Sequence, residues 1–349
     1  MTTRVLVVDD SATMRAILTR LLDSEADIEV IGAAADAMQA RGMIRELNPD
    51  VVTLDIEMPG MNGLDFLEKI MSLRPMPVVI VSGITQKGCD TTIRALELGA
   101  VDCYAKPDGS VSNLLASDGG TLARMVRDAA RVRFVQVPSA PVRKDPVAQK
   151  TIEASRVGNS GTRLIAIGAS TGGVEALHHL LPAFPANCPP TVIVQHISAA
   201  FAPAMAERLN KQCTAKVQLI ESGALLEPGN IYIAPGNDKH AIVGGGERLI
   251  AKMLPGELCS SHRPSIDKMF ESVAQRLGPA AVGILLTGMG QDGARGLLAM
   301  RRAGARTIAQ DEATSTVYGM PRVAADLGAA EKILPLPRIA ERALSAAGI

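Results

Sequence analysis

The stretch RLIAIGASTGG, residues 163–173, decides how the C-terminal half of this chain folds. A short apolar run ends in small residues, and a helix-like segment, VEALHHLL, follows at 174–181. A strand, a tight turn and a helix are the unit from which parallel α/β sheets are built. The turn between them either cradles a phosphate or presents Ser170 as a nucleophile.

The same alternation continues on the C-terminal side of this stretch. Helix-like segments alternate with apolar runs of strand length at 191–197, 216–221, 281–287 and 306–310. Between them the glycine-rich segment NIYIAPGNDKHAIVGGGERLIAKM, 230–253, predicts a β-hairpin. Residues 161–345 therefore predict a Rossmann-like α/β domain, a doubly wound parallel sheet with a hairpin insertion.

The N-terminal third predicts a second doubly wound parallel sheet. Five apolar runs are separated by amphipathic segments such as SATMRAILTRLL; the runs are 4–8, 28–34, 50–54, 76–81 and 100–104. We expect a flavodoxin-like (βα)5 domain over residues 3–121, with its last helix running on to about residue 134. Residues 135–160 lose periodicity and collect Pro, Ser and charge, which predicts a linker.

Composition excludes several classes of function. Lys plus Arg and Asp plus Glu balance at 36 each, so no strong field draws the chain to nucleic acid or an anionic membrane. Its apolar runs are too short to insert in a bilayer, and Asp9 and Asp10 interrupt the first run in a way a signal peptide would not tolerate. The five cysteines lack metal-ligand spacing and predict reduced thiols in a cytoplasmic protein.

Polar residues follow the strands of the N-terminal domain where a parallel sheet places its site. They are Asp9 and Asp10, Asp55, Ser82 and Lys106. Converging carboxylates repel one another unless a cation joins them, and Mg²⁺ suits oxygen ligands. A carboxylate there can take up a phosphoryl group, with the lysine and serine holding its oxygens. Taken singly, each residue is better explained as a helix cap or strand end.

The motifs VLVVDDSATMR, DVVTLDIEMPGMNGLDFL, PVVIVSG and AKP resemble the receiver domain of two-component response regulators. The resemblance implies that Asp55 is phosphorylated, that Asp10, Asp55 and the Glu57 carbonyl surround Mg²⁺, and that Asp9 supports them. Ser82 and Lys106 would contact the phosphoryl group. Receivers often carry an aromatic residue three positions before the lysine, where this chain has Cys103, with Tyr104 next to it.

The turn at Gly168–Gly172 favours a nucleophile over a phosphate site. It matches G-x-S-x-G after an apolar strand, and it matches neither common phosphate-loop pattern. The N–H of Thr171 at the following helix start is a natural oxyanion donor. Such a short pattern also arises by chance, so the serine needs a base and an orienting acid nearby.

His196 is the best-placed base, because it ends the next strand and can reach the same sheet edge as Ser170. His178 and His179 lie roughly 12 Å or more along the helix that follows Ser170, too far to act on it. We expect one of the two to be half-buried and the other solvated. His240 and His262 lie in loops and stay open as cleft residues, or less plausibly as metal ligands.

Two aspartates compete for the orienting role. Asp292 follows the glycine-rich turn after one apolar strand, and Asp311 follows another. The glycines slightly favour Asp292, and the Met289 N–H beside them is a second oxyanion candidate. Either aspartate could instead be a turn or cap residue.

The motifs IGASTGG, VQHI, YIAPG, SHRPSID and LTGMGQDG resemble the catalytic domain of the chemotaxis protein-glutamate methylesterases. The resemblance implies a Ser170–His196–Asp292 triad with a Met289 backbone contribution to the oxyanion site. It implies hydrolysis of receptor glutamate methyl esters with release of methanol, deamidation of some receptor glutamines, and no cofactor for ester hydrolysis. The implied partners are a chemotaxis histidine kinase and the cytoplasmic domains of chemoreceptors, and we expect a monomer.

Two other classes remain open from the residues alone. One is a response regulator whose second domain binds DNA, although no basic recognition helix is visible. The other is a phosphorylation-controlled esterase for a small molecule. We also expect the unphosphorylated receiver to pack over the catalytic cleft and hinder access, with phosphorylation shifting that packing.

Overall fold

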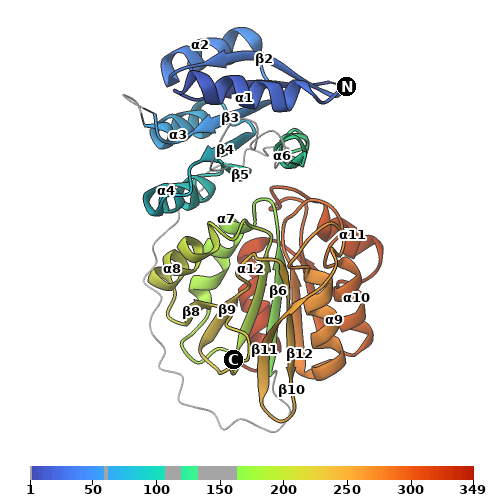
Figure 1. Cartoon of the computed structure of the whole chain (residues 1–349). Coiled ribbons are helices and arrows are strands. Elements are labelled where there is room, and N and C mark those ends of the chain that lie inside the picture. Colours follow the sequence, from blue (N-terminus) through green and yellow to red (C-terminus); the bar gives the residue numbers. More distant parts are fainter. Residues whose placement is uncertain (1, 59–61, 107–118, 133–162) are drawn as a thin grey trace.

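The computed structural model describes residues 2–58, 62–106, 119–132 and 163–349, arranged around two separate parallel sheets (Figure 1). The linker expected at 135–160 lies outside the described residues. No helix in these ranges combines the length and apolarity that a membrane crossing requires.

The N-terminal sheet has five parallel strands in the order β2-β1-β3-β4-β5. The strands are β1 (Thr3–Val8), β2 (Ile28–Ala34), β3 (Val51–Asp55), β4 (Val78–Ser82) and β5 (Asp102–Ala105). The helices are α1 (Ala12–Asp23), α2 (Ala37–Leu47), α3 (Gly63–Leu73), α4 (Gln86–Glu97) and α6 (Thr121–Ala129). Helices on both faces explain why β3 and β4 are buried at every residue. This confirms the predicted flavodoxin-like order, with the strand order reversing between β1 and β3.

The C-terminal sheet has seven parallel strands in the order β14-β13-β12-β6-β7-β9-β8. The strands are β6 (Leu164–Ala169), β7 (Thr191–Gln195), β8 (Lys216–Leu219), β9 (Asn230–Ile233), β12 (Ala281–Leu285), β13 (Arg306–Gln310) and β14 (Lys332–Leu334). The helices are α7 (Gly173–Leu180), α8 (Ala202–Gln212), α9 (Ile266–Leu277), α10 (Ala294–Arg302), α11 (Met320–Asp326) and α12 (Leu336–Ala346). The predicted doubly wound second domain is confirmed.

One part of the predicted hairpin is wrong. The segment NIYI forms β9, which pairs in parallel with β7 and β8 inside the main sheet. The hairpin consists only of β10 (Lys239–Gly245) and β11 (Leu249–Pro255), paired antiparallel. The reason is burial: Ile231, Tyr232 and Ile233 are fully buried or nearly so, as a central strand requires. The short segment 234–238, which contains Pro235 and Gly236, separates the two kinds of pairing.

The two halves of the chain touch along α4, which packs against α7 and α8 (Figure 1). Its residues join a continuous apolar cluster with side chains of those two helices, including Leu96, Val174 and Met205. The carboxyl ends of β6 and β7 therefore face the N-terminal domain, which decides where the sites lie.

Candidate active site and phosphorylation site

Ser170 sits in the turn between β6 and α7, and hydrogen bonds from three sides fix that turn. Its N–H donates to the Thr287 carbonyl (3.0 Å), and its carbonyl accepts from Gly173 N (2.7 Å) and from Gln195 Nε2 (2.8 Å). Thr287 follows β12 and Gln195 ends β7, the two strands beside β6. The neighbouring strands therefore hold the serine at the edge of the sheet.

The glycines around Ser170 are required by close approach. A Cβ on Gly173 would lie 2.1 Å from Gln195 Oε1, and one on Gly288 would lie 2.6 Å from the Ser170 Cβ. Gly172 has φ +75°, a conformation that other residues rarely adopt. Within the G-x-S-x-G pattern itself, a Cβ on Gly168 would lie 2.3 Å from Ile266 Cγ2, and one on Gly172 would lie 2.4 Å from Thr316 Cβ.

His196 and Asp292 meet at the same sheet edge. His196 follows β7, and its Nε2 lies 2.9 Å from Asp292 Oδ2. A carboxylate only accepts, so Nε2 carries the proton, and Nδ1 holds the lone pair. That Nδ1 is buried and has no hydrogen-bond partner among the described residues. Among the described residues, no hydrogen bond joins His196 Nδ1 to the Ser170 hydroxyl.

The start of α9 holds the Asp292 carboxylate. Oδ1 accepts from Ser265 Oγ (2.7 Å) and Asp267 N (3.1 Å), and Oδ2 accepts from Ile266 N (2.7 Å). Burial alone would raise the pKa of Asp292, but His196 and these donors outweigh it and lower the pKa below its usual value. The side chain is therefore an anion with a fixed orientation.

The rival aspartate has a different task. Asp311 Oδ1 accepts from Thr314 N (3.0 Å) and Thr314 Oγ1 (2.7 Å). These hydrogen bonds stabilise a local turn and do not involve a histidine.

The other histidines are placed as follows. His178 is half-buried and His179 exposed, as predicted. His178 Nε2 lies 3.0 Å from Glu97 of the N-terminal domain. His240 lies in β10 rather than in the predicted loop; it is buried and accepts from Ser265 N (3.1 Å), so it lies behind the Asp292 cradle. His262 stacks on His196, with ring centroids 3.8 Å apart.

Two backbone amides beside Ser170 make no hydrogen bond within the described residues. They are those of Thr171 and Met289, the residues predicted to bind an oxyanion. The Thr171 carbonyl accepts from Thr287 Oγ1 (3.0 Å), which fixes the orientation of the peptide unit that follows Thr171. Met289 comes directly after Gly288, whose approach to Ser170 is described above.

Three supporting residues were not found by sequence reasoning: Gln195, Ser265 and Thr287. Ser265 had a detectable signal, because a serine before the helical pattern of residues 266–277 is a typical N-cap, and it does cap α9. Gln195 and Thr287 act across strands, and nothing local in the sequence marks them.

A second polar site lies at the carboxyl edge of the N-terminal sheet. Lys106 Nζ lies 2.6 Å from Asp55 Oδ2 and 2.8 Å from Asp9 Oδ2. Ser82 is buried at the end of β4. The Glu57 N–H donates to Asp55 Oδ1 (3.1 Å), so the backbone of Glu57 lies beside the Asp55 carboxylate. The predicted cluster is therefore brought together; the N-cap of α1 is the neighbouring Ser11, not Asp9 or Asp10.

The donor set of this cluster fits a divalent cation. Carboxylate oxygens of Asp9, Asp10 and Asp55 lie within 4.8 Å of one another, and Lys106 pairs with two of these residues, Asp9 and Asp55. Burial raises the pKa of Asp9, and the nearby charge of Asp55 adds to this although Lys106 opposes it. Burial also works against the charge of Lys106, but the two aspartates raise the pKa of Lys106 overall. A hard cation beside these oxygens would relieve the repulsion.

The aromatic-switch positions are both buried. Cys103 packs in the apolar cluster that contains Ile80 and Ile93, and Tyr104 packs with Leu122 and Val126 on the other face.

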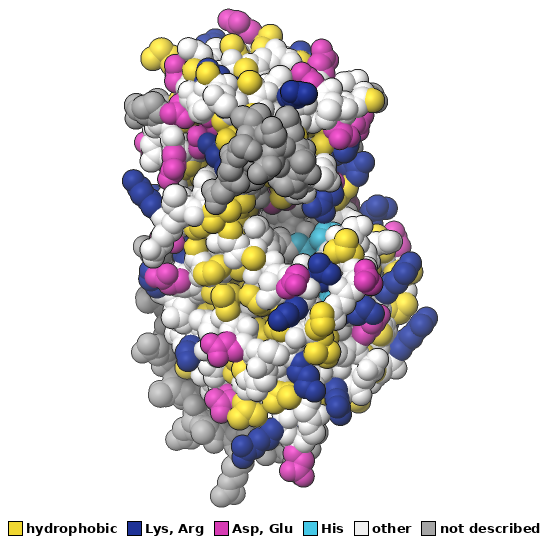
Figure 2. All heavy atoms as spheres, in the orientation of Figure 1, with side chains coloured by type: hydrophobic (Ala, Val, Ile, Leu, Met, Phe, Trp, Pro, Cys, Tyr) yellow, Lys and Arg dark blue, Asp and Glu magenta, His cyan; other side chains and the backbone are white. Residues whose placement is uncertain are grey.

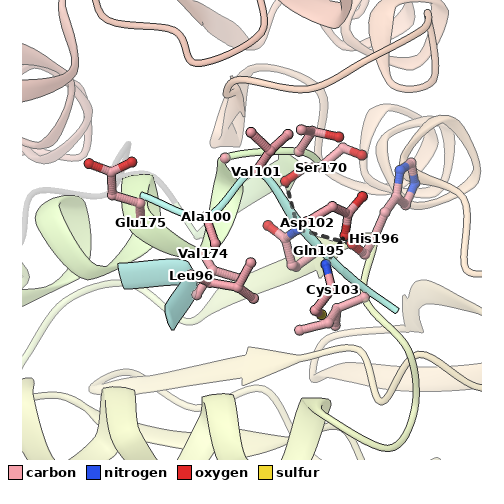
Figure 3. Close-up of a pocket in the computed structure, with 13 residues that line it drawn as sticks. Leu96, Ala100, Val101, Asp102, Cys103, Ser170, Val174, Glu175, Gln195 and His196 are labelled. Atoms are coloured by element: carbon pink, nitrogen blue, oxygen red, sulfur yellow. Dashed lines mark hydrogen bonds between the residues drawn. The ribbon is translucent and has the colours of Figure 1, made fainter. Parts of the chain in front are cut away.

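Ser170 and His196 line a narrow pocket between the two domains (Figure 3). The N-terminal domain contributes Leu96 from α4 and Asp102 and Cys103 from β5. Figure 2 shows histidine side chains in the hollow between the two halves. The N-terminal domain thus lies over the sheet edge that carries Ser170.

Comparison with known proteins gives the same two parts. Residues 5–116 match the response regulator receiver domain, and residues 165–343 match the CheB methylesterase family. A protein-glutamate methylesterase/protein-glutamine glutaminase of Rhizobium etli is 53% identical over 98% of this chain and 95% of its own length. One of Caulobacter vibrioides is 52% identical over 99% and 98%.

A solved structure supports the C-terminal fold. The methylesterase catalytic domain of CheB from Thermotoga maritima is 31% identical, with a TM-score of 0.52, and covers 53% of this chain and 98% of its own. The chain belongs to the CheB methylesterase family, with a receiver domain N-terminal to the catalytic domain.

Proposed function

We propose that this protein hydrolyses methyl esters of glutamate side chains on the cytoplasmic domains of chemoreceptors, under control of phosphorylation of its own receiver domain. The same site deamidates specific receptor glutamines. The relatives named above carry both activities in their names. The observation that carries the proposal is the pairing of His196 with Asp292 at the sheet edge where Ser170 is held.

In the first half of the reaction, Ser170 Oγ attacks the ester carbonyl and His196 Nδ1 takes the proton of the hydroxyl. The backbone N–H groups of Thr171 and Met289 stabilise the negative charge that forms on the carbonyl oxygen. When the tetrahedral intermediate collapses, His196 returns the proton to the departing methanol. Asp292 keeps the imidazole in the required tautomer and stabilises its charged form.

In the second half, water attacks the acyl-serine and gives its proton to the same histidine. The glutamate carboxylate leaves, and Ser170 regains its proton. A glutamine side chain follows the same path, with ammonia as the leaving group instead of methanol. No cofactor takes part in either reaction.

Asp55 accepts the phosphoryl group from a chemotaxis histidine kinase. Lys106, already paired with Asp55, moves its charge onto the phosphoryl oxygens, and the Ser82 hydroxyl donates to them. Asp10, Asp55 and the Glu57 carbonyl would hold Mg²⁺, with Asp9 beside them. The ion supplies positive charge that offsets the carboxylates and the incoming phosphoryl oxygens.

The test is methanol release from methylated receptor membranes, with and without Mg²⁺ and a small phosphodonor. Release that rises with the phosphodonor, is lost in Ser170→Ala, and stays at the basal level in Asp55→Asn supports both sites and their coupling. Hydrolysis of soluble esters without any release from receptor membranes would instead favour a small-molecule esterase.

The same proposal includes inhibition of the unphosphorylated protein by its receiver domain, which covers the catalytic pocket. Leu96 and Asp102 of the receiver share the pocket with Ser170, so a receptor helix cannot approach while the domains are packed (Figure 3). The domain boundaries proposed are 3–121 and 161–345. Removal of residues 1–150 should therefore raise activity without phosphodonor, and the coverage idea is wrong if it does not.

A further inference from the structure

His262 makes an unusual contact with the proposed catalytic base. Its ring lies flat on the ring of His196, with centroids 3.8 Å apart and planes inclined by 3°. The contact closes one face of the imidazole that also bonds Asp292. No hydrogen bond joins the two rings, so the contact is one of ring faces.

The loop that carries His262 is built to hold this position. Cys259 and His262 pair through two backbone hydrogen bonds of 3.1 and 2.9 Å. The two residues between them, Ser260 and Ser261, have φ of +51° and +66°, a region uncommon for residues other than glycine, asparagine and aspartate. A turn held in this form presents the ring in one place.

His262 is neutral in this position. Its Nδ1 lies 2.7 Å from the Ser260 carbonyl, which only accepts, so Nδ1 carries the proton. Burial, and then the neighbouring His196, lower the pKa of His262 to about 4. The charged groups that act on it are His196, Asp292 and Arg124 of α6 in the receiver. Near neutral pH the stack therefore contains at most one charge, that of His196.

A shared metal ion does not explain the pair. Ring nitrogens of His196 and His262 and a carboxylate oxygen of Asp292 lie within 4.8 Å of one another. Nitrogen lone pairs lie in the ring plane, and the two planes are parallel, so both cannot point at one ion at about 2 Å. The ring orientation fits stacking instead.

We propose that His262 is a positioning residue for catalysis: its neutral ring fixes the plane of His196 and stabilises that imidazole when it carries the proton from Ser170. The electron-rich face of an aromatic ring attracts a cation, and stacking restricts rotation of the partner. The inference rests on the proposed role of His196 as base.

The decisive comparison uses two substitutions in the full-length phosphorylated protein. His262→Leu keeps an apolar group of similar size but removes the ring face, and His262→Phe restores a ring without nitrogens. We expect His262→Leu to lower kcat for methanol release about tenfold with little change in KM, and to move the acidic limb of the pH profile to lower pH. His262→Phe should recover most of both. His179→Leu, the same change at an exposed position on α7, is the matched control.

A second readout does not depend on substrate. The proton on His196 Nε2, shared with Asp292, is identified in proton NMR spectra by its loss in His196→Gln. We expect the signal of this proton to broaden or shift upfield in His262→Leu, because the His196 ring then loses its fixed plane. In His262→Phe the signal should return to its wild-type position, because a ring again stacks on His196.

The His196 and His262 variants together distinguish a failure of this inference from a failure of the proposed function. If His196→Ala abolishes methanol release while His262→Leu keeps wild-type kcat, pH profile and NMR signal, the inference is overturned and the proposed triad stands. If both His262 variants lose activity equally with an unmoved acidic limb, His262 is only structural and the inference is again wrong. Full activity of His196→Ala would overturn both proposals.

Discussion

Asp292 combines two tasks within one carboxylate. It accepts from His196, and it accepts from three groups at the start of α9, so its position fixes both the histidine and the helix. A neutral amide at this position could keep the shape of the site. It could not keep the pattern of donors and acceptors. Its NH₂ would face either the Ile266 N–H or the Asp267 N–H, which only donate, and next to His196 it would make Nε2 an acceptor.

Asp292→Asn should therefore lower kcat by about 10⁴-fold through the wrong histidine tautomer. The measurement is methanol release by the phosphorylated protein. Asp311→Asn is the matched control, since the Asp311 carboxylate accepts from Thr314 in its own turn and its loss should leave kcat near wild type. Equal losses in the two variants would reject Asp292 as the orienting acid.

Gly288 tests whether Ser170 must lie where it does. Its added Cβ would lie 2.6 Å from the Ser170 Cβ, so Gly288→Ala has to displace the serine turn. We expect kcat to fall about 10²-fold, because shifts of about 1 Å at a reacting group cost that much. Gly246→Ala, where the new Cβ meets nothing within 4 Å, should keep its activity. Wild-type kcat in Gly288→Ala would show that the turn tolerates displacement.

At the scale of elements, α4 is the helix of the receiver that packs against α7 and α8 of the catalytic domain. Glu97 at its end accepts hydrogen bonds from Nε and Nη2 of Arg208 on α8, and it lies 3.0 Å from His178 Nε2 of α7. His178 Nδ1 in turn lies 2.6 Å from Gln212 of α8. Burial lowers the pKa of His178, with Gln212 and Glu97 opposing that shift. Arg208 is therefore the main cation facing Glu97 near neutral pH.

Glu97→Gln should loosen this contact and raise the activity of the unphosphorylated protein. A partly exposed bidentate pair of this kind is worth about 1 kcal/mol, so we expect a rise of about fivefold, with little change after phosphorylation. Glu207→Gln removes a carboxylate of the same α8 that pairs with exposed Lys211, and it should leave basal activity unchanged. An unchanged basal rate in Glu97→Gln would mean that this contact does not restrain the receiver.

How far the sequence predicted the structure also depends on the element. Strands such as β3 and β12 were predictable because a run buried on both faces is apolar throughout. Placing Ser170 and His196 together needed only the rule that successive parallel strands end at one edge. β9 was assigned to the hairpin because nothing in the short segment 234–238 distinguishes a change from parallel to antiparallel pairing from a hairpin turn. The three-residue β14 has mostly exposed side chains and carries no apolar signal.

The site was less predictable where partners come from distant parts of the chain. Ser265 and Ile266 reach Asp292 across 27 and 26 residues, and Thr287 reaches Thr171 across 116. Such contacts depend on how α9 and the strands pack, which periodicity does not encode. For the same reason the sequence could only leave His262 open as a cleft residue.

At the scale of the whole molecule, domain closure brings a receiver carboxyl to the catalytic pocket. Asp102 of β5 lines that pocket together with Ser170 and His196 (Figure 3). Burial raises the pKa of Asp102 to about 6, with the charge of Asp128 adding to the effect and Cys103 N and Arg124 opposing it. Separation of the domains would return water to this side chain and lower its pKa toward the ordinary 3.8.

Closure should consequently depend on pH. A carboxyl whose pKa is higher in the closed form binds its proton preferentially there. Its contribution to closure is complete below about pH 4 and is lost as the pH rises through about 6. The unphosphorylated protein should thus open more at pH 7.5 than at pH 5, by about tenfold in the closed-to-open ratio.

Amide hydrogen exchange on α4 and α7, corrected for the intrinsic effect of pH on exchange, measures this opening. Asp102→Asn keeps an acceptor for the Cys103 N–H (2.8 Å) but cannot ionise, so its opening should be nearly the same at both pH values. A pH dependence that persists undiminished in Asp102→Asn would assign the effect to another group at the interface. If wild-type opening does not change between pH 5 and 7.5, the burial of Asp102 does not depend on how the domains pack.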